Sequence, residues 1–63
     1  ALEEIYYFME GDGVMWIDGE DVPITQGDVI LAPEGSDHGF RNTGTSPLKL
    51  VILWGEPIKE WTQ

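Results

Sequence analysis

The sequence has one histidine, His38, and no cysteine, so thiolate ligands, thiolate nucleophiles and disulfide bonds are excluded. A lone histidine is ordinarily structural, either hydrogen-bonded to a carbonyl or exposed to solvent. His38, however, follows a segment with a clear pattern: Gly27 suits the start of a strand, Pro33 suits its end, and Gly35 suits the tight turn that comes next. We therefore expect His38 to enter the next strand with its imidazole pointing inward.

Aromatic residues provide a second group of candidates. Alternation along residues 4–9 places Tyr6 and Phe8 on the same face as Glu4, and Phe40 falls on the inward face of the strand that contains His38. Ligand pockets are mostly apolar with a few polar groups, so Tyr6 and Phe40 are candidate ligand-binding residues. Plain core packing is the alternative for both, and it is the role that we expect for Phe8.

These side chains must be positioned by β-structure. Eight glycines and four prolines separate segments that are rich in Val, Ile, Tyr, Phe and Trp and have no helical period. The predicted strands cover residues 3–9, 14–18, 21–25, 28–32, 38–42 and 48–54. We expect an all-β domain over residues 1–55 and a C-terminal tail over residues 56–63. Ile58 and Trp61 in the tail suit either one helical turn or an extended strap.

Three connections contain glycine and polar residues that permit tight turns, and each predicts an antiparallel hairpin. They are residues 11–13, 18–20 and 43–46. Pro23 cannot donate a ladder hydrogen bond, so its strand should lie at a sheet edge or contain a bulge. Asn42 should cap the turn that follows it, and Trp16 can face inward or outward.

Both faces of the segments 4–9 and 48–54 are largely apolar, which is unusual for a strand with one face in water. A chain of 63 residues buries only about 60% of its unfolded surface, so its stability should be marginal. Another segment or subunit should therefore cover the outer face, and we expect a homodimer.

Charge excludes some partners. Twelve acidic and three basic residues give a net charge of −9, which disfavours binding to the phosphate backbone of a nucleic acid. The acidic residues are scattered along the chain, so keeping the protein soluble is their simplest role. The longest apolar runs, residues 29–32 and 50–54, are too short to span a bilayer, and no signal peptide is visible. We expect a protein that does not contact the membrane. Because the chain has no cysteine for disulfide bonds, the reducing cytoplasm is the location that we expect by default.

Two motifs carry a family resemblance. Residues 27–42, GDVILAPEGSDHGFRN, resemble the second motif of the cupin superfamily, G-x5-P-x-G-x2-H-x3-N, with every fixed position filled. Residues 4–11, EIYYFMEG, resemble the end of the first motif, H-x-H-x(3,4)-E-x6-G, through Glu4 and Gly11. The resemblance covers about residues 3–55. It implies an antiparallel jelly-roll β-barrel, or part of one.

The resemblance also implies a metal site. In the family, the first-motif glutamate and second-motif histidine, here Glu4 and His38, bind one divalent metal such as iron, manganese, nickel or zinc, together with the two first-motif histidines. Those two histidines would precede Ala1, so we expect an N-terminally truncated chain. Two ligands hold a metal weakly, because such sites ordinarily use three or four. We therefore expect a weak or absent metal site.

Three functions remain open. The parent protein is expected to be a metal-binding cupin that binds or acts on a small polar molecule, and this chain is not expected to be catalytic by itself. The alternatives are a metal-free module that binds or senses a sugar or organic acid, and a structural dimerisation domain. One cupin barrel hosts many chemistries, so the sequence leaves the reaction undefined.

Overall fold

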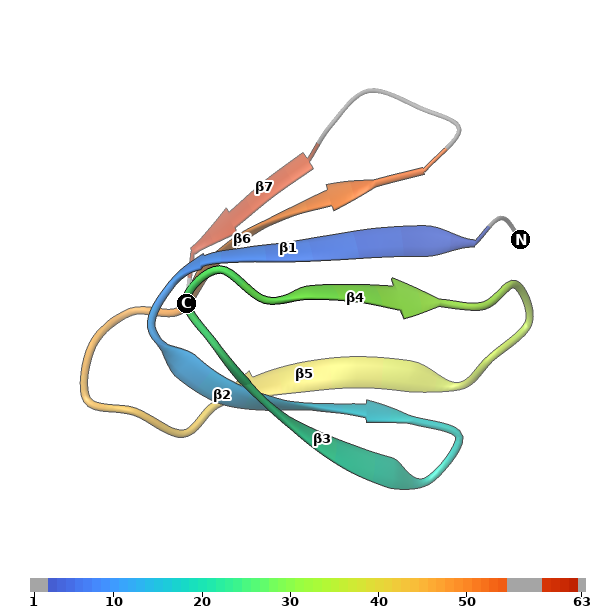
Figure 1. Cartoon of the computed structure of the whole chain (residues 1–63), viewed down its shortest axis with the longest axis horizontal. Coiled ribbons are helices and arrows are strands. Elements are labelled where there is room, and N and C mark those ends of the chain that lie inside the picture. Colours follow the sequence, from blue (N-terminus) through green and yellow to red (C-terminus); the bar gives the residue numbers. More distant parts are fainter. Residues whose placement is uncertain (1–2, 55–58, 63) are drawn as a thin grey trace.

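The computed structural model describes residues 3–54 and 59–62, and this part of the chain contains seven strands and no helix. The strands are β1 (Glu4–Glu10), β2 (Asp12–Ile17), β3 (Glu20–Thr25), β4 (Val29–Ala32), β5 (His38–Asn42), β6 (Lys49–Leu53) and β7 (Lys59–Thr62). They form two antiparallel sheets, in the orders β4-β1-β6-β7 and β3-β2-β5 (Figure 1). The predicted all-β antiparallel fold is confirmed. Among the described residues, no helix is available to cross a membrane.

The hydrophobic core lies between the two sheets and takes side chains from both. Its buried members are Tyr6, Phe8, Met15, Ile24, Ala32, Leu48, Leu50 and Ile52. In β1, Phe8 is fully buried whereas its neighbour Tyr7 is 41% exposed, as the predicted alternation requires. The core role that we predicted for Phe8 is confirmed.

Two of the three predicted hairpins are wrong. Strand β1 lies in the four-stranded sheet and β2 in the three-stranded sheet, so residues 11–13 form a corner between sheets. Residues 43–46 likewise connect β5 in one sheet with β6 in the other. Glycine and polar residues permit a sharp change of direction, but they do not determine whether the next strand pairs with the previous one. At the first corner, Gly11 has a φ of 92°, which disfavours a residue with a side chain.

The third predicted hairpin is confirmed. Ile17 of β2 pairs with Glu20 of β3, which leaves the two-residue loop Asp18-Gly19. Both loop residues have positive φ, 48° and 84°, as in the type I′ turn that matches the twist of paired strands. Strand β3 is an edge strand, as the presence of Pro23 predicted.

The orientation of Trp16, which the sequence left open, is outward. Its neighbour Met15 is fully buried, so alternation in β2 places Trp16 on the opposite face. There it lies opposite Gly39 of β5, and a Cβ atom on Gly39 would collide with the Trp16 ring. The indole therefore covers the space that the glycine leaves.

Residues 59–62 of the predicted tail are extended. Strand β7 pairs antiparallel with β6, with Trp61 opposite Leu50 and Lys59 opposite Ile52. The alternative of a helical turn is therefore wrong for these residues, whereas Ile58 lies outside the described part of the chain. The division between residues 1–55 and 56–63 stays a prediction.

Candidate functional site

His38 is positioned by the turn that precedes it. The Ser36 N–H donates to the Pro33 carbonyl over 3.1 Å, and Gly35, the third residue of the turn, has a φ of 80°. This is the geometry of a type II turn, which favours glycine at that position. His38 then begins β5, and its side chain is 18% exposed. The predicted roles of Pro33, Gly35 and an inward-pointing His38 agree with this geometry.

Glu4 and His38, which are 34 residues apart in the chain, meet in the folded protein. His38 Nε2 lies 2.7 Å from Glu4 Oε1, and the Glu4 side chain is 26% exposed. Glu4 belongs to the four-stranded sheet and His38 to the three-stranded sheet, so the contact joins the two sheets at the β1 start and the β5 start. The structure thus brings together the two residues that the motifs single out.

The hydrogen-bond network determines which nitrogen of His38 carries hydrogen. Nδ1 lies 3.0 Å from the Ser36 carbonyl oxygen and 3.0 Å from Ser36 Oγ. The Ser36 hydroxyl already donates to the Pro33 carbonyl over 2.7 Å, so both Ser36 oxygens accept from Nδ1. Nδ1 therefore carries a hydrogen, and Nε2 is the nitrogen that faces Glu4.

Tyr6 provides the other polar contact of Glu4. Its hydroxyl donates to Glu4 Oε1 over 2.9 Å, and Tyr6 is only 5% exposed. Burial, the hydrogen bond to Glu4 and the negative charge of Glu4 together raise the pKa of Tyr6 well above its usual range. Tyr6 is therefore a neutral hydrogen-bond donor at physiological pH.

The donor atoms fit part of a metal site. A histidine that binds a metal through one nitrogen usually donates its other N–H to a carbonyl or carboxylate, as His38 does to Ser36. His38 Nε2 and Glu4 Oε1 lie 2.7 Å apart, and both are atoms of a kind that can bind a divalent metal. In residues 3–54 and 59–62, no three His, Cys, Asp or Glu side chains lie close enough together to hold a metal ion. The described residues thus bring together two candidate ligand atoms.

The predicted ligand-binding aromatics lie beside this pair. The Tyr6 ring contacts the His38 ring edge-on at 5.7 Å and the Phe40 ring at 5.9 Å, measured between centroids. Tyr6 belongs to the core and Phe40 packs against it, partly buried. Contact of these two residues with a ligand stays a prediction.

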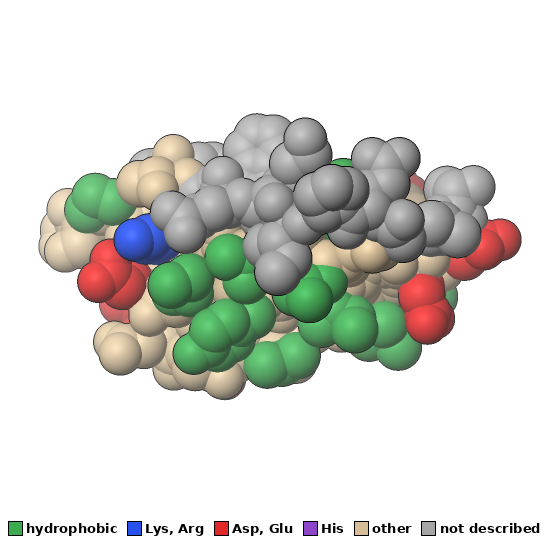
Figure 2. Space-filling view, turned by 90° about the horizontal axis from the view of Figure 1, so that it is seen from above, with side chains coloured by type: hydrophobic (Ala, Val, Ile, Leu, Met, Phe, Trp, Pro, Cys, Tyr) green, Lys and Arg blue, Asp and Glu red, His purple; other side chains and the backbone are tan. Residues whose placement is uncertain are grey.

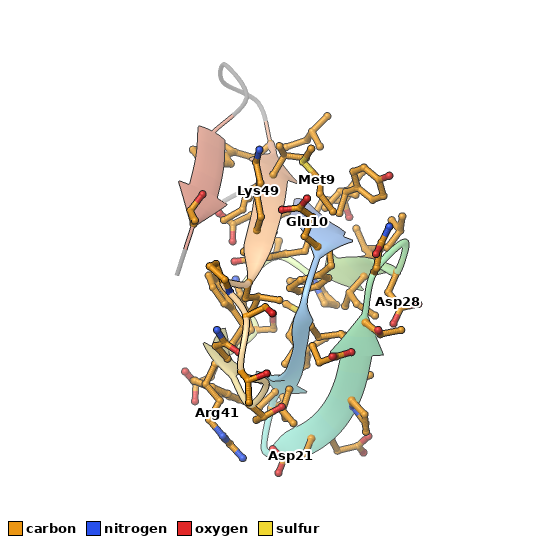
Figure 3. The ribbon with its side chains drawn as sticks, turned by 90° about the vertical axis from the view of Figure 1, so that its left-hand side faces the viewer. Met9, Glu10, Asp21, Asp28, Arg41 and Lys49 are labelled. Atoms are coloured by element: carbon orange, nitrogen blue, oxygen red, sulfur yellow. The ribbon has the colours of Figure 1, made fainter. Side chains whose placement is uncertain are left out.

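The last fixed residue of the second motif, Asn42, has a structural role. Asn42 donates to the Ser46 carbonyl and accepts from the Gly44 N–H, both over 2.8 Å, so the predicted turn cap is confirmed. Arg41 points away from the sheet (Figure 3). Sequence reasoning missed Ser36 and the hydroxyl role of Tyr6. The two-residue spacings from Ser36 to His38 and from Glu4 to Tyr6 are the available signals.

Comparison with known proteins places these motifs in a family. The cupin domain family matches residues 1–54. This chain belongs to the cupin domain family. It is 44% identical over 50 residues to an oxalate-binding protein of Thermotoga maritima, an alignment that covers 79% of this chain and 41% of the relative. No solved structure gives a significant match to this cupin domain.

Two further relatives of the cupin domain are named as dioxygenases. Acireductone dioxygenase 4 of Oryza sativa is 37% identical over 68 residues, covering 98% of this chain and 36% of the relative. Quercetin 2,3-dioxygenase of Bacillus subtilis is 34% identical over 38 residues, covering 60% of this chain and 11% of the relative. The chain therefore spans less than half the length of each of these three relatives.

Proposed function

We propose that this cupin domain supplies two ligands, Glu4 and His38, to a divalent-metal site of a longer parent protein. The observation that carries the proposal is the 2.7 Å contact between Glu4 Oε1 and His38 Nε2, which arises between two different sheets. His38 would bind through Nε2, because the Ser36 carbonyl holds Nδ1–H. Two ligands are fewer than the three of a typical catalytic metal site, so the proposal does not make this chain an enzyme by itself.

We propose that the parent protein binds or transforms a small organic molecule with several oxygen atoms. Support comes from the names of the relatives, which refer to oxalate, acireductone and quercetin. A metal bound here would act as a Lewis acid on a ligand oxygen. The chain's own contribution is to hold the two donor groups, with the Tyr6 ring packed edge-on against the His38 ring and the Phe40 ring packed against Tyr6.

Metal titration tests the proposal. We expect the purified chain to bind one equivalent of Co²⁺ weakly in isothermal titration calorimetry, and we expect His38→Ala and Glu4→Gln each to weaken binding more than about 100-fold, beyond the usual effect of outer-shell changes. Glu10→Gln is the matched control, because Glu10 is an exposed acid at the other end of β1. A wild-type chain that binds no Co²⁺, or equal losses in Glu4→Gln and Glu10→Gln, would overturn the proposal.

The metal-free alternative has a different signature. A small-ligand module would bind oxalate or a sugar in the absence of metal, and the ligand would raise the melting temperature by stabilising the folded state. Metal-free stabilisation by oxalate, unchanged by His38→Ala, would favour that alternative over a metal site.

We also propose that the outer side of the four-stranded sheet packs against a second copy of the chain. The large apolar residues exposed on this sheet, here called the outer apolar face, are Ile5, Tyr7, Val29, Leu31 and Leu53. They form cross-strand rows, since Ile5 pairs with both Leu31 and Leu53, and Tyr7 pairs with Val29. Figure 2 shows hydrophobic side chains grouped together, with acidic side chains toward the two ends of the molecule.

Charge and size support a second copy as the occupant. Two chains of net charge −9 repel each other, and the five side chains of the outer apolar face carry no charge. The chain exposes 4046 Å², close to the roughly 4,100 Å² of a compact protein of 7.1 kDa, so the face is not the result of an expanded fold. A standard interface buries about 800 Å² on each partner, roughly a fifth of this surface.

The oligomeric state tests this surface. We expect the wild-type chain to be a dimer in sedimentation equilibrium and Leu31→Lys to be a monomer, because lysine would place a charge in an apolar interface. Thr45→Lys adds the same charge at an exposed loop residue and should remain a dimer. A wild-type monomer, or loss of the dimer in both variants, would contradict the proposal.

A further inference from the structure

Tyr6 has a buried ring and a hydroxyl that reaches the candidate metal site. We infer that Tyr6 is a positioning residue, which holds the Glu4 carboxylate in the orientation that faces His38. The inference rests on the proposed metal site and assigns a role to a residue that neither cupin motif specifies. Its basis is the 2.9 Å hydrogen bond from the Tyr6 hydroxyl to Glu4 Oε1, the same oxygen that lies 2.7 Å from His38 Nε2.

The Tyr6 ring is fixed by aromatic contacts. It stacks on Phe8 at 6.3 Å and meets Phe40 edge-on at 5.9 Å, and Tyr6 is 5% exposed. Edge-on and offset stacked contacts of this kind are favourable and restrict the ring orientation. The hydroxyl therefore approaches Glu4 from a direction that the core determines.

Glu4 needs such an anchor more than His38 does. A glutamate side chain has several rotatable bonds, and Glu4 is 26% exposed at the start of β1, so solvent alone would leave many rotamers accessible. The Tyr6 hydroxyl selects a rotamer in which Oε1 faces Nε2. On the other side of the pair, the Ser36 carbonyl selects the orientation of the imidazole. Each ligand thus has one partner that fixes its direction, and loss of such partners typically lowers metal affinity about 10–100-fold.

The alternative role for Tyr6 is core packing alone, with the hydroxyl merely satisfied by the nearest carboxylate. The two roles differ in what Tyr6→Phe should change. That substitution keeps the ring and removes the hydroxyl, so a packing role predicts altered thermal stability with unchanged metal affinity. A positioning role predicts weaker metal binding at temperatures where the metal-free variant is folded.

Co²⁺ titration of the full chain separates these roles. We expect Tyr6→Phe to bind Co²⁺ about 10–100-fold more weakly than wild type. Tyr7→Phe is the matched control and should bind like wild type, because Tyr7 is the next residue of β1 and is 41% exposed on the opposite face.

The outcomes distinguish failure of this inference from failure of the proposed metal site. A wild-type chain without Co²⁺ binding overturns the metal site itself. Wild-type binding that Tyr6→Phe leaves unchanged overturns the positioning role alone. The melting temperature of each metal-free variant shows whether the titrated protein is folded.

Discussion

Replacing Phe8 with alanine is expected to leave most of the chain unfolded at room temperature. Phe8 is fully buried, pairs with Leu50 across the sheet and contacts the rings of Tyr6 and Phe40. Truncating a buried phenylalanine costs about 3–5 kcal/mol. Native proteins are stable by about 0.05–0.15 kcal/mol per residue, which gives about 3–9 kcal/mol for 63 residues. The cost is therefore comparable to the whole free energy of unfolding.

Urea denaturation followed by circular dichroism measures this effect. Phe8→Leu retains much of the apolar volume and should show a folded baseline and a lower midpoint, so the series remains informative if Phe8→Ala has no folded population. An exposed site on the same strand supplies the comparison: Glu10→Ala should change the free energy of unfolding by less than about 0.5 kcal/mol. A Phe8→Ala midpoint equal to that of wild type would contradict the burial on which the prediction depends.

The strands and the core could be predicted from the sequence because their signals are local. A period of two along β1 places Tyr6 and Phe8 on one face and Tyr7 on the other, whichever strand lies beside them. Strand pairing is not local in this sense. The segments at residues 11–13 and 18–20 have similar compositions, yet one is a corner between sheets and the other a hairpin. The choice depends on which sheet can bury the following strand.

Only the residues of the candidate site that occupy fixed motif positions could be predicted from the sequence. Motif spacing identified Glu4 and His38, and the fold brings them to 2.7 Å. The contributions of Ser36 and Tyr6 were not predictable in the same way, because a hydroxyl or carbonyl has many potential partners until the backbone positions are known. Tyr6 also packs against the His38 and Phe40 rings of β5 in the other sheet, so its hydroxyl direction depends on packing between the sheets.

The site is therefore sensitive to how the two sheets are joined. Glu4 lies on β1 in one sheet and His38 on β5 in the other, and the corner at Gly11 is the covalent link between β1 and β2, which pairs with β5. Gly11 is also the glycine at the end of the first motif. A change at this corner would shift the sheets relative to each other, and it would separate the two donor atoms without touching either.

Gly11→Ala is accordingly expected to destabilise the fold and to weaken metal binding. Gly11 has a φ of 92°, and a Cβ atom there would lie 2.7 Å from the Pro47 carbonyl oxygen and 3.0 Å from the Leu48 Cα atom. Both neighbours are backbone, so they cannot move aside as a flexible side chain would. The unfavourable φ costs about 1–2 kcal/mol, and crowding of this kind adds about 1–3 kcal/mol. Thermal denaturation and Co²⁺ titration measure the two effects.

Gly27→Ala separates the backbone contribution from the steric one. Gly27 has the same φ of 92°, but a Cβ atom there would meet nothing within 4 Å. We expect Gly27→Ala to lose only the conformational part, about 1–2 kcal/mol, and to bind Co²⁺ like wild type at temperatures where it is folded. Equal destabilisation of Gly11→Ala and Gly27→Ala would show that the close approach to Pro47 does not hold the sheets in place. A larger loss in Gly11→Ala, together with weaker Co²⁺ binding, would show that the corner sets the distance between Glu4 and His38.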